Sequence, residues 1–140
     1  CNGNEAACPP DAFLPATAHL GESSPEFIHP EFFPYLRRIG HGVQIALHRP
    51  ELLAELRERG ICIELCPSTY VQTGTFANLE PVREVTRRLD EAGVDYCIAT
   101  DNPAFNGRYL QAEHEIALDN DLLDFRGLVR CQQNAFKHAF

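Results

Sequence analysis

Four short apolar runs alternate along the chain with longer segments of helical periodicity. These runs cover residues 15–19, 37–42, 61–66 and 94–100. Parallel strands that are buried on both faces have continuous apolar sequences, and a crossover connection, usually a helix, separates each from the next. The sequence therefore predicts an α/β fold with four parallel strands, adjacent in chain order, and helices outside them.

The segments between the runs carry the signals of amphipathic helices. Pro50 suits a first helical turn, and Gly60 marks the end of that helix. Further along, Val82, Val85 and Leu89 share one helical face. The expected helices cover residues 50–60, 79–92, 110–118 and 125–140.

Four strand-helix units amount to half of a (β/α)8 TIM barrel, which typically needs about 250 residues in full. The chain has 140 residues, of which 44% are hydrophobic and 23% charged, as in an ordinary globular domain. The prediction is therefore a partial barrel, roughly strands 5 to 8 of the full fold, in one domain that spans residues 1–140.

Charge and cysteine content narrow the expected partners and setting. The formal net charge of -8 has the wrong sign for binding phosphate backbones, so no nucleic-acid partner is expected. No apolar run approaches the roughly 20 residues that span a bilayer, so no membrane partner is expected either. Cys62 and Cys97 lie inside apolar runs, which favours a reduced, cytoplasmic protein. A structural zinc on Cys62 and Cys66 lacks a second cysteine pair to complete it.

Polar residues gather where each predicted strand ends. A lone histidine there is usually a satisfied polar residue, and Asp-Asn-Pro is an ordinary turn signal. In a parallel barrel, however, all strand ends lie on one face, so His19, Glu22, His41 and Asp101 are expected to share one pocket. The four strand-end segments are His19-Leu20-Gly21-Glu22, Gly40-His41-Gly42, Cys66-Pro67-Ser68-Thr69 and Thr100-Asp101-Asn102-Pro103.

In this order the motifs resemble those of adenosine deaminase and its relatives in the amidohydrolase superfamily. The resemblance covers nearly the whole chain and implies the carboxyl-terminal part of a metal-dependent deaminase barrel domain. The segments that carry it are Asn2-Gly3-Asn4-Glu5, His19-x-Gly21-Glu22, Gly40-His41-Gly42, Glu64-x-Cys66-Pro67-Ser68 with Gly74, and Thr100-Asp101-x-Pro103.

The resemblance implies a role for each strand-end residue. His19 and Asp101 would be ligands of one Zn²⁺ ion, which leaves a position open for water. His41 would orient or deprotonate that water, and Glu22 would protonate a ring nitrogen of a purine. The implied reaction is zinc-dependent hydrolytic deamination of an aminopurine, such as adenosine or a related adenine compound, with release of ammonia.

Two further residues would contact the small-molecule purine substrate. Gly3 would face the purine edge through its backbone, and Asn102 would form a hydrogen bond with the ring near its imidazole side. Asn102 stands where most family members have a second aspartate. An amide keeps the acceptor oxygen, adds a donor and removes the charge. The sequence therefore does not specify which purine is the preferred substrate.

The chain departs from the family pattern in its metal ligands. The family's first strand supplies a His-x-His pair to the zinc, and this sequence contains no such pair. Further ligands are expected from an amino-terminal part, and the isolated 140 residues are expected to be inactive. The segment between Glu5 and His19 is also shorter than in the family by about one helix. The remaining histidines are interpreted as solvated or locally bonded; they are His29, His48, His114 and His138.

Other interpretations concern both the chemistry and the assembly. A second class of zinc deaminases has the signature H-x-E followed by P-C-x-x-C; His29-Pro30-Glu31 matches only its first part, which excludes that class.

A non-catalytic half barrel could act as a binding or assembly module, with the remainder of its own barrel or a homo-oligomer as partner. A related metal-dependent amidohydrolase with another substrate also stays open, although Gly3 and Glu22 favour deamination.

Overall fold

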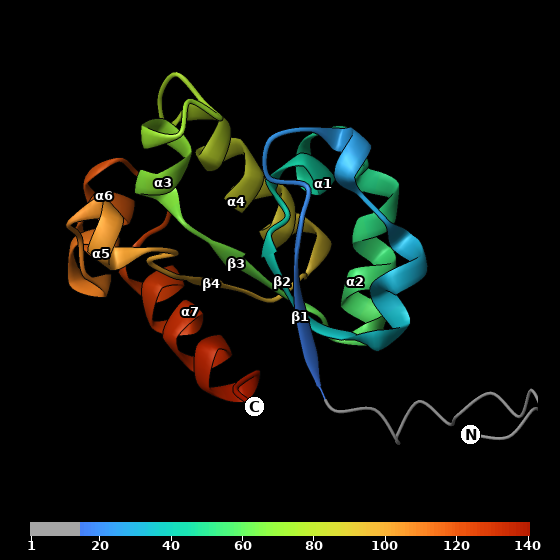
Figure 1. Cartoon of the computed structure of the whole chain (residues 1–140). Coiled ribbons are helices and arrows are strands. Elements are labelled where there is room, and N and C mark those ends of the chain that lie inside the picture. Colours follow the sequence, from blue (N-terminus) through green and yellow to red (C-terminus); the bar gives the residue numbers. More distant parts are fainter. Residues whose placement is uncertain (1–14) are drawn as a thin grey trace, which may run out of the picture.

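Within the described part of the chain, the sheet has four parallel strands (Figure 1). The computed structural model describes residues 15–140, so Gly3 lies outside the described residues. Neighbours in the sheet follow the chain order β1-β2-β3-β4, which confirms the predicted topology. The strands are β1 (Ala16–Leu20), β2 (Leu36–His41), β3 (Cys62–Leu65) and β4 (Tyr96–Ile98).

Helices lie outside the sheet and occupy the segments where the sequence predicts them. These are α2 (Leu53–Arg59), α4 (Glu80–Ala92), α6 (Leu110–Asp119) and α7 (Phe125–Lys137). A 3-10 turn, η4 (Pro50–Leu52), precedes α2, so the α-helix begins later than expected. Among the described helices none is long and apolar enough to cross a membrane.

Several shorter helical segments have no counterpart among the predicted elements. They are too short to display a full apolar stripe, which is the signal on which sequence periodicity depends. They are η2 (Pro25–Phe27), η3 (Pro30–Tyr35), α1 (Val43–His48), α3 (Pro67–Gln72) and α5 (Pro103–Asn106).

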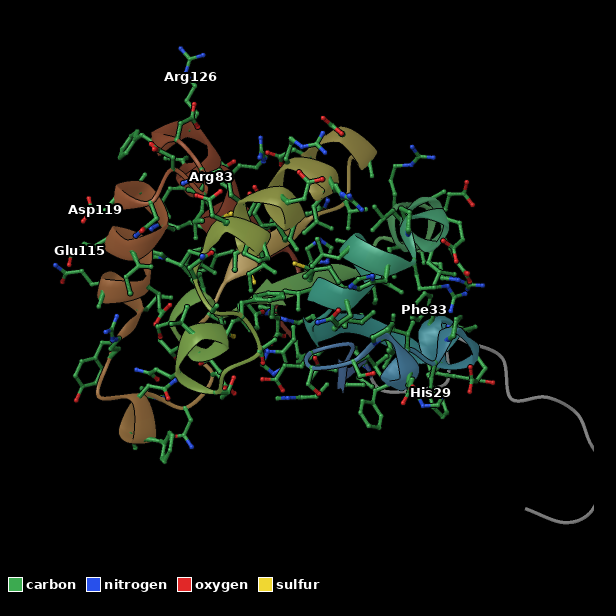
Figure 2. The ribbon with its side chains drawn as sticks, turned by 90° about the horizontal axis from the view of Figure 1, so that it is seen from above. His29, Phe33, Arg83, Glu115, Asp119 and Arg126 are labelled. Carbon is green, nitrogen blue, oxygen red and sulfur yellow. The ribbon has the colours of Figure 1, made fainter. Side chains whose placement is uncertain are left out.

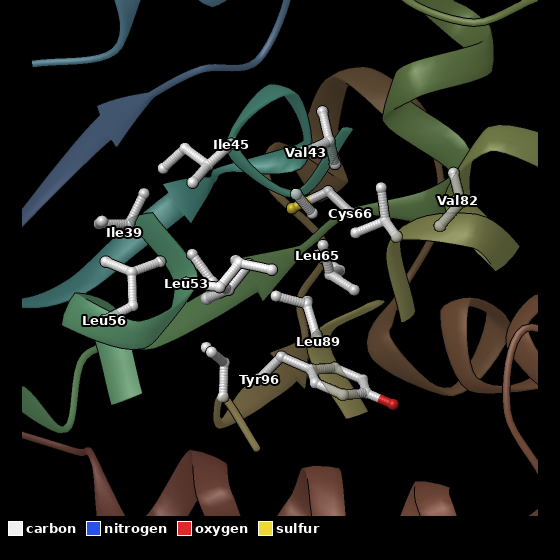
Figure 3. Packing of buried hydrophobic residues seen from close by; sticks show 14 of the residues in the cluster. Ile39, Val43, Ile45, Leu53, Leu56, Leu65, Cys66, Val82, Leu89 and Tyr96 are labelled. Atoms are coloured by element: carbon white, nitrogen blue, oxygen red, sulfur yellow. The ribbon is translucent and has the colours of Figure 1, made fainter. Parts of the chain in front are cut away.

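One face of the sheet packs against the helices and forms the core. Ile39 and Ile63 are partners in the strand register, as are Ile63 and Tyr96, and all three side chains are buried. Leu56 of α2 and Leu89 of α4 pack on this face (Figure 3). Full burial of one such side chain stabilises the fold by roughly 1.5–3 kcal/mol, so this layer holds the strands in place.

The opposite face carries polar side chains and would face the interior of a closed barrel. His19, Gly40, Glu64 and Cys97 are successive partners across the four strands. One step nearer the amino ends of the strands, Arg38 donates from Nε to Glu64 Oε1 at 2.5 Å and from Nη2 to Cys97 Sγ at 3.4 Å. The ion pair between Arg38 and Glu64 thus joins β2 to β3 on this face of the sheet.

Replacing Gly42 with alanine is expected to destabilise the fold through a direct clash. Gly42 has φ +61°, and an added Cβ would lie 2.6 Å from Cδ1 of the buried Ile63. Overpacking of a core typically costs about 1–3 kcal/mol, and this adds to the roughly 1–2 kcal/mol of a left-handed alanine. Urea denaturation measures the change in the free energy of unfolding.

Gly60→Ala is the matched control for this prediction. Gly60 has φ +64°, but an added Cβ would meet nothing within 4 Å. The control should therefore lose only the roughly 1–2 kcal/mol of backbone strain. Equal losses in the two variants would contradict the clash at Ile63.

Candidate active site

The carboxyl ends of the strands surround a cavity of about 210 Å³. Three of the predicted site residues line it: His19 from β1, His41 from β2 and Asp101 from the loop after β4. The full lining is His19, Gly40, His41, Glu64, Cys66, Ala99, Thr100 and Asp101. Parallel strands thus bring together residues that are up to 82 positions apart in the sequence, from 19 to 101.

His19 and Glu22 both lie next to His41. Nε2 of His41 is hydrogen-bonded to Nδ1 of His19 at 3.1 Å and lies 3.6 Å from Oε2 of Glu22. The ring of His19 extends over Gly40, where an added Cβ would lie 3.2 Å from Cδ2 of the imidazole. Glycine at this position therefore leaves the room that the His19 ring occupies.

The backbone at His41 turns its ring into the cavity. Strand alternation would place His41 on the helix-packed face with Ile39, but φ is +71° at His41 and the strand ends there. A non-glycine residue in this conformation typically costs about 1–2 kcal/mol, and such strain occurs at functional sites. Asp101 has the same feature, with φ +57°.

Burial makes His41 a candidate proton acceptor. Its exposed fraction is 2%, and burial lowers its pKa, while the carboxylates of Glu22 and Asp101 act in the opposite direction. The neutral imidazole, which can accept a proton, is therefore favoured at neutral pH. Nδ1 is buried and has no hydrogen-bond partner within residues 15–140, and the Tyr70 ring packs edge-on at 5.7 Å between centroids.

Asn102 caps a short helix beside the cavity. Its Oδ1 accepts a hydrogen bond from the backbone N–H of Phe105 at 3.0 Å and so caps the amino end of α5. Asn102 does not belong to the cavity lining, although the neighbouring Asp101 does. Since a backbone N–H can only donate, the amide oxygen is the end of the side chain that faces α5.

Glu64 and Cys66 also line the cavity, although the sequence motifs predict no chemical role for either residue. A carboxylate inside an apolar run is an unusual pattern, and that signal could have identified Glu64. Burial raises the pKa of the Cys66 thiol, so the thiol is protonated at neutral pH and is a poor nucleophile. The described cysteines, which are Cys62, Cys66, Cys97 and Cys131, are buried and free.

The donor atoms of the cavity fit part of a zinc site. His19 offers an imidazole nitrogen and Asp101 a carboxylate oxygen, and both atom types are common zinc ligands. Within the described part of the chain, no group of three or more His, Cys, Asp or Glu side chains is arranged to hold a metal ion. Catalytic zinc sites usually have three protein ligands, so these residues amount to a partial set.

The structure changes the interpretation of one remaining histidine. His29 is exposed and bonded to the nearby Glu31 at 3.1 Å, as expected. His138 is instead buried, and its Nε2 lies 2.8 Å from Oδ2 of Asp95, 43 residues earlier. Sequence proximity could not reveal this contact, because the fold brings the end of α7 beside β4.

The fold and the cavity define a barrel-type α/β protein with a polar site at the carboxyl ends of its strands. The family model for adenosine deaminase matches residues 7–140. The chain therefore belongs to the adenosine deaminase family.

Relatives of known sequence are considerably longer than this chain. It is 36% identical over 132 residues to an adenosine deaminase of Vibrio cholerae, a match that covers 93% of this chain and 39% of the relative. It is 35% identical over 109 residues to an adenine deaminase of Rhizobium johnstonii, with 76% of this chain and 33% of the relative covered. The chain thus spans well under half the length of these curated relatives.

Solved structures share the fold. The ADAL-IMP complex matches with a TM-score of 0.71 at 20% identity, over 90% of this chain and 36% of that chain. The N6-methyl-AMP deaminase of Arabidopsis thaliana in its apo form matches with a TM-score of 0.69 at 19% identity, again over 90% and 36%. These matches support the description of the four-stranded sheet as part of a larger barrel.

Proposed function

We propose that this chain supplies the carboxyl-terminal part of a zinc-dependent enzyme that hydrolytically deaminates an aminopurine, adenosine or a related adenine compound. The observation that carries the proposal is the convergence of His19, His41 and Asp101 on one cavity, with Glu22 beside His41. The similarity to proteins named adenosine deaminase and adenine deaminase supports a purine as substrate.

His19 and Asp101 would hold the metal. Because Nδ1 of His19 is hydrogen-bonded to His41, Nε2 is the nitrogen left for a metal ion. Zinc, when bound, would supply a water molecule whose pKa is lowered towards about 7. The remaining ligands would come from an amino-terminal part that carries the family's His-x-His pair.

The protein side chains would handle the protons of the reaction. Neutral His41 would orient the attacking water and accept a proton from it. Glu22 would donate a proton to a ring nitrogen while the water oxygen bonds to the carbon that bears the amino group. As the carbon-nitrogen bond breaks, the amino group would take the proton held by His41 and leave as ammonia. The hydroxyl proton would return to Glu22, and a carbonyl group would remain on the ring.

Asn102 and Gly3 would contact the purine. Because Asn102 Oδ1 accepts from Phe105, its amide nitrogen is the group left to donate to an acceptor on the ring. Gly3, which lies outside the described residues, would face the purine edge through its backbone.

The proposal includes a cytoplasmic setting for the protein. The described cysteines, which are buried and free, support it.

The isolated 140-residue chain is expected to bind zinc weakly and to show no detectable deamination. Its two candidate protein ligands fall short of the three that catalytic zinc sites usually have. A longer chain that adds the amino-terminal part should deaminate an aminopurine and lose that activity on chelation.

Ammonia release and product chromatography with adenosine, adenine and other aminopurines measure the reaction, and zinc analysis after dialysis measures occupancy. Efficient turnover by the 140 residues alone, or activity of the longer chain that survives metal removal, would contradict the proposal. Hydrolysis of a different amide or amidine instead would favour the related amidohydrolase.

A second candidate function is a non-catalytic assembly module. Within the described sheet, β1 and β4 each pair on one side only, and an open strand edge can bind another chain. The partner would be the remainder of a barrel or another copy of this chain. Light scattering measures the oligomeric state, and a longer chain with no turnover on any aminopurine would favour this alternative.

A further inference from the structure

Glu113 places a carboxylate in the interior of the protein. It lies on α6 with an exposed fraction of 0%. Within residues 15–140, its side chain accepts two hydrogen bonds from Ser68: one from the backbone N–H at 3.0 Å and one from the hydroxyl. A buried carboxylate is tolerated only where hydrogen bonds replace its lost hydration. Glu113 and Ser68 therefore hold each other in place.

Ser68 belongs to α3, which begins directly after Cys66 of the cavity lining. Tyr70 on the same helix is fully buried, and its hydroxyl accepts a hydrogen bond from the Cys66 N–H at 3.1 Å. The ring of Tyr70 meets the ring of His41 edge-on, at 5.7 Å between centroids and 67° between planes. The connection from Glu113 to His41 thus consists of hydrogen bonds to Ser68, one short helix and one ring contact.

The position of α3 depends on contacts from outside the helix. It has six residues, too few for its own hydrogen bonds to stabilise it. Asn106 braces it from α5 by donating to Thr69 Oγ1 at 2.8 Å, and Glu113 braces it from α6. Of these two braces, the bond from Asn106 joins partly buried groups, whereas the bonds to Glu113 are fully buried.

We propose that Glu113 is a positioning residue for the candidate site: by holding Ser68, it keeps α3 and Tyr70 packed against His41. This inference rests on the proposed function, in which His41 handles the attacking water. The sequence does not single out Glu113, because it shares a charged helix with Glu115 and Asp119. Figure 2 shows these two side chains pointing away from the molecule.

Two substitutions separate the hydrogen bonds of Glu113 from its packing. In Glu113→Gln, the amide can accept the Ser68 N–H and donate to the Ser68 hydroxyl oxygen, whereas in Glu113→Leu the side chain does neither. In the 140-residue chain at fixed pH, we expect nuclear Overhauser contacts between the rings of Tyr70 and His41 to persist in Glu113→Gln and to be lost in Glu113→Leu. In an active longer chain, Glu113→Leu should lower kcat by about 10- to 100-fold.

Glu115→Leu is the matched control, because Glu115 is exposed on the same helix and its side chain accepts a hydrogen bond from Gln111, one turn earlier. It should leave the ring contacts unchanged. If Glu113→Leu does not fold, Ser68→Ala removes the hydroxyl bond, keeps the N–H bond and should weaken the same contacts.

Intact contacts between Tyr70 and His41 in folded Glu113→Leu, or in Ser68→Ala in its place, would overturn the proposal. Loss of the contacts in Glu113→Gln as well would also overturn it, because charge rather than hydrogen bonding would then be responsible. The ring contacts are measured without substrate. A failed deaminase assay would therefore count against the proposed function and leave this result standing.

Discussion

Glu22→Gln is expected to abolish most turnover in a longer chain that contains these residues, while fold and zinc content stay unchanged. The glutamine amide has nearly the shape of the carboxyl group but cannot deliver a proton to the purine ring. Loss of one general acid typically lowers the rate by about 10²–10⁴-fold. The site tolerates this change sterically, because Glu22 is only partly buried and its backbone carbonyl keeps the bond from Gln44.

The test measures kcat and bound zinc together. Glu26→Gln is the matched control, since Glu26 is an exposed carboxylate four residues further along, in η2. It should retain full activity. Near-normal turnover in Glu22→Gln would mean that the proton comes from another group, and a loss of zinc in that variant would mean that Glu22 supports the metal site instead.

Asp101→Ala is expected to lower both zinc occupancy and turnover. Asp101 lines the cavity with His19, and alanine removes its oxygen donors without filling the space. Loss of a ligand should weaken binding by more than the roughly 10- to 100-fold that loss of an outer-shell partner costs. Zinc content after dialysis and kcat at saturating zinc distinguish weak binding from a slow reaction.

Asp121→Ala controls for backbone strain in this experiment. Asp121 is an exposed aspartate with φ +51°, close to the φ +57° of Asp101, and it lies outside the cavity lining. Both variants should lose similar stability, because each places alanine in the left-handed region. Asp101→Ala with normal zinc content would exclude Asp101 as a ligand, and equal loss of activity in Asp121→Ala would assign the effect to stability.

The sequence by itself determined the order of strands and the long helices. Continuous apolar runs mark the buried strands β3 and β4, and the stripe of Val82, Val85 and Leu89 marks the buried side of α4. Both signals are local and repeat over many residues. The strand-end residues followed from the same topology, because parallel neighbours in chain order end on one face.

Only the tertiary structure decided how those residues meet and what supports them. The left-handed backbone at His41, the ring of His19 above Gly40 and the Asn102 cap on α5 depend on dihedral angles that no sequence period specifies. The contact between Glu113 and Ser68 joins residues 45 positions apart. A glutamate in a charged helix looks solvated in the sequence; its burial arises because α6 packs against α3, and such packing between distant segments leaves no local pattern.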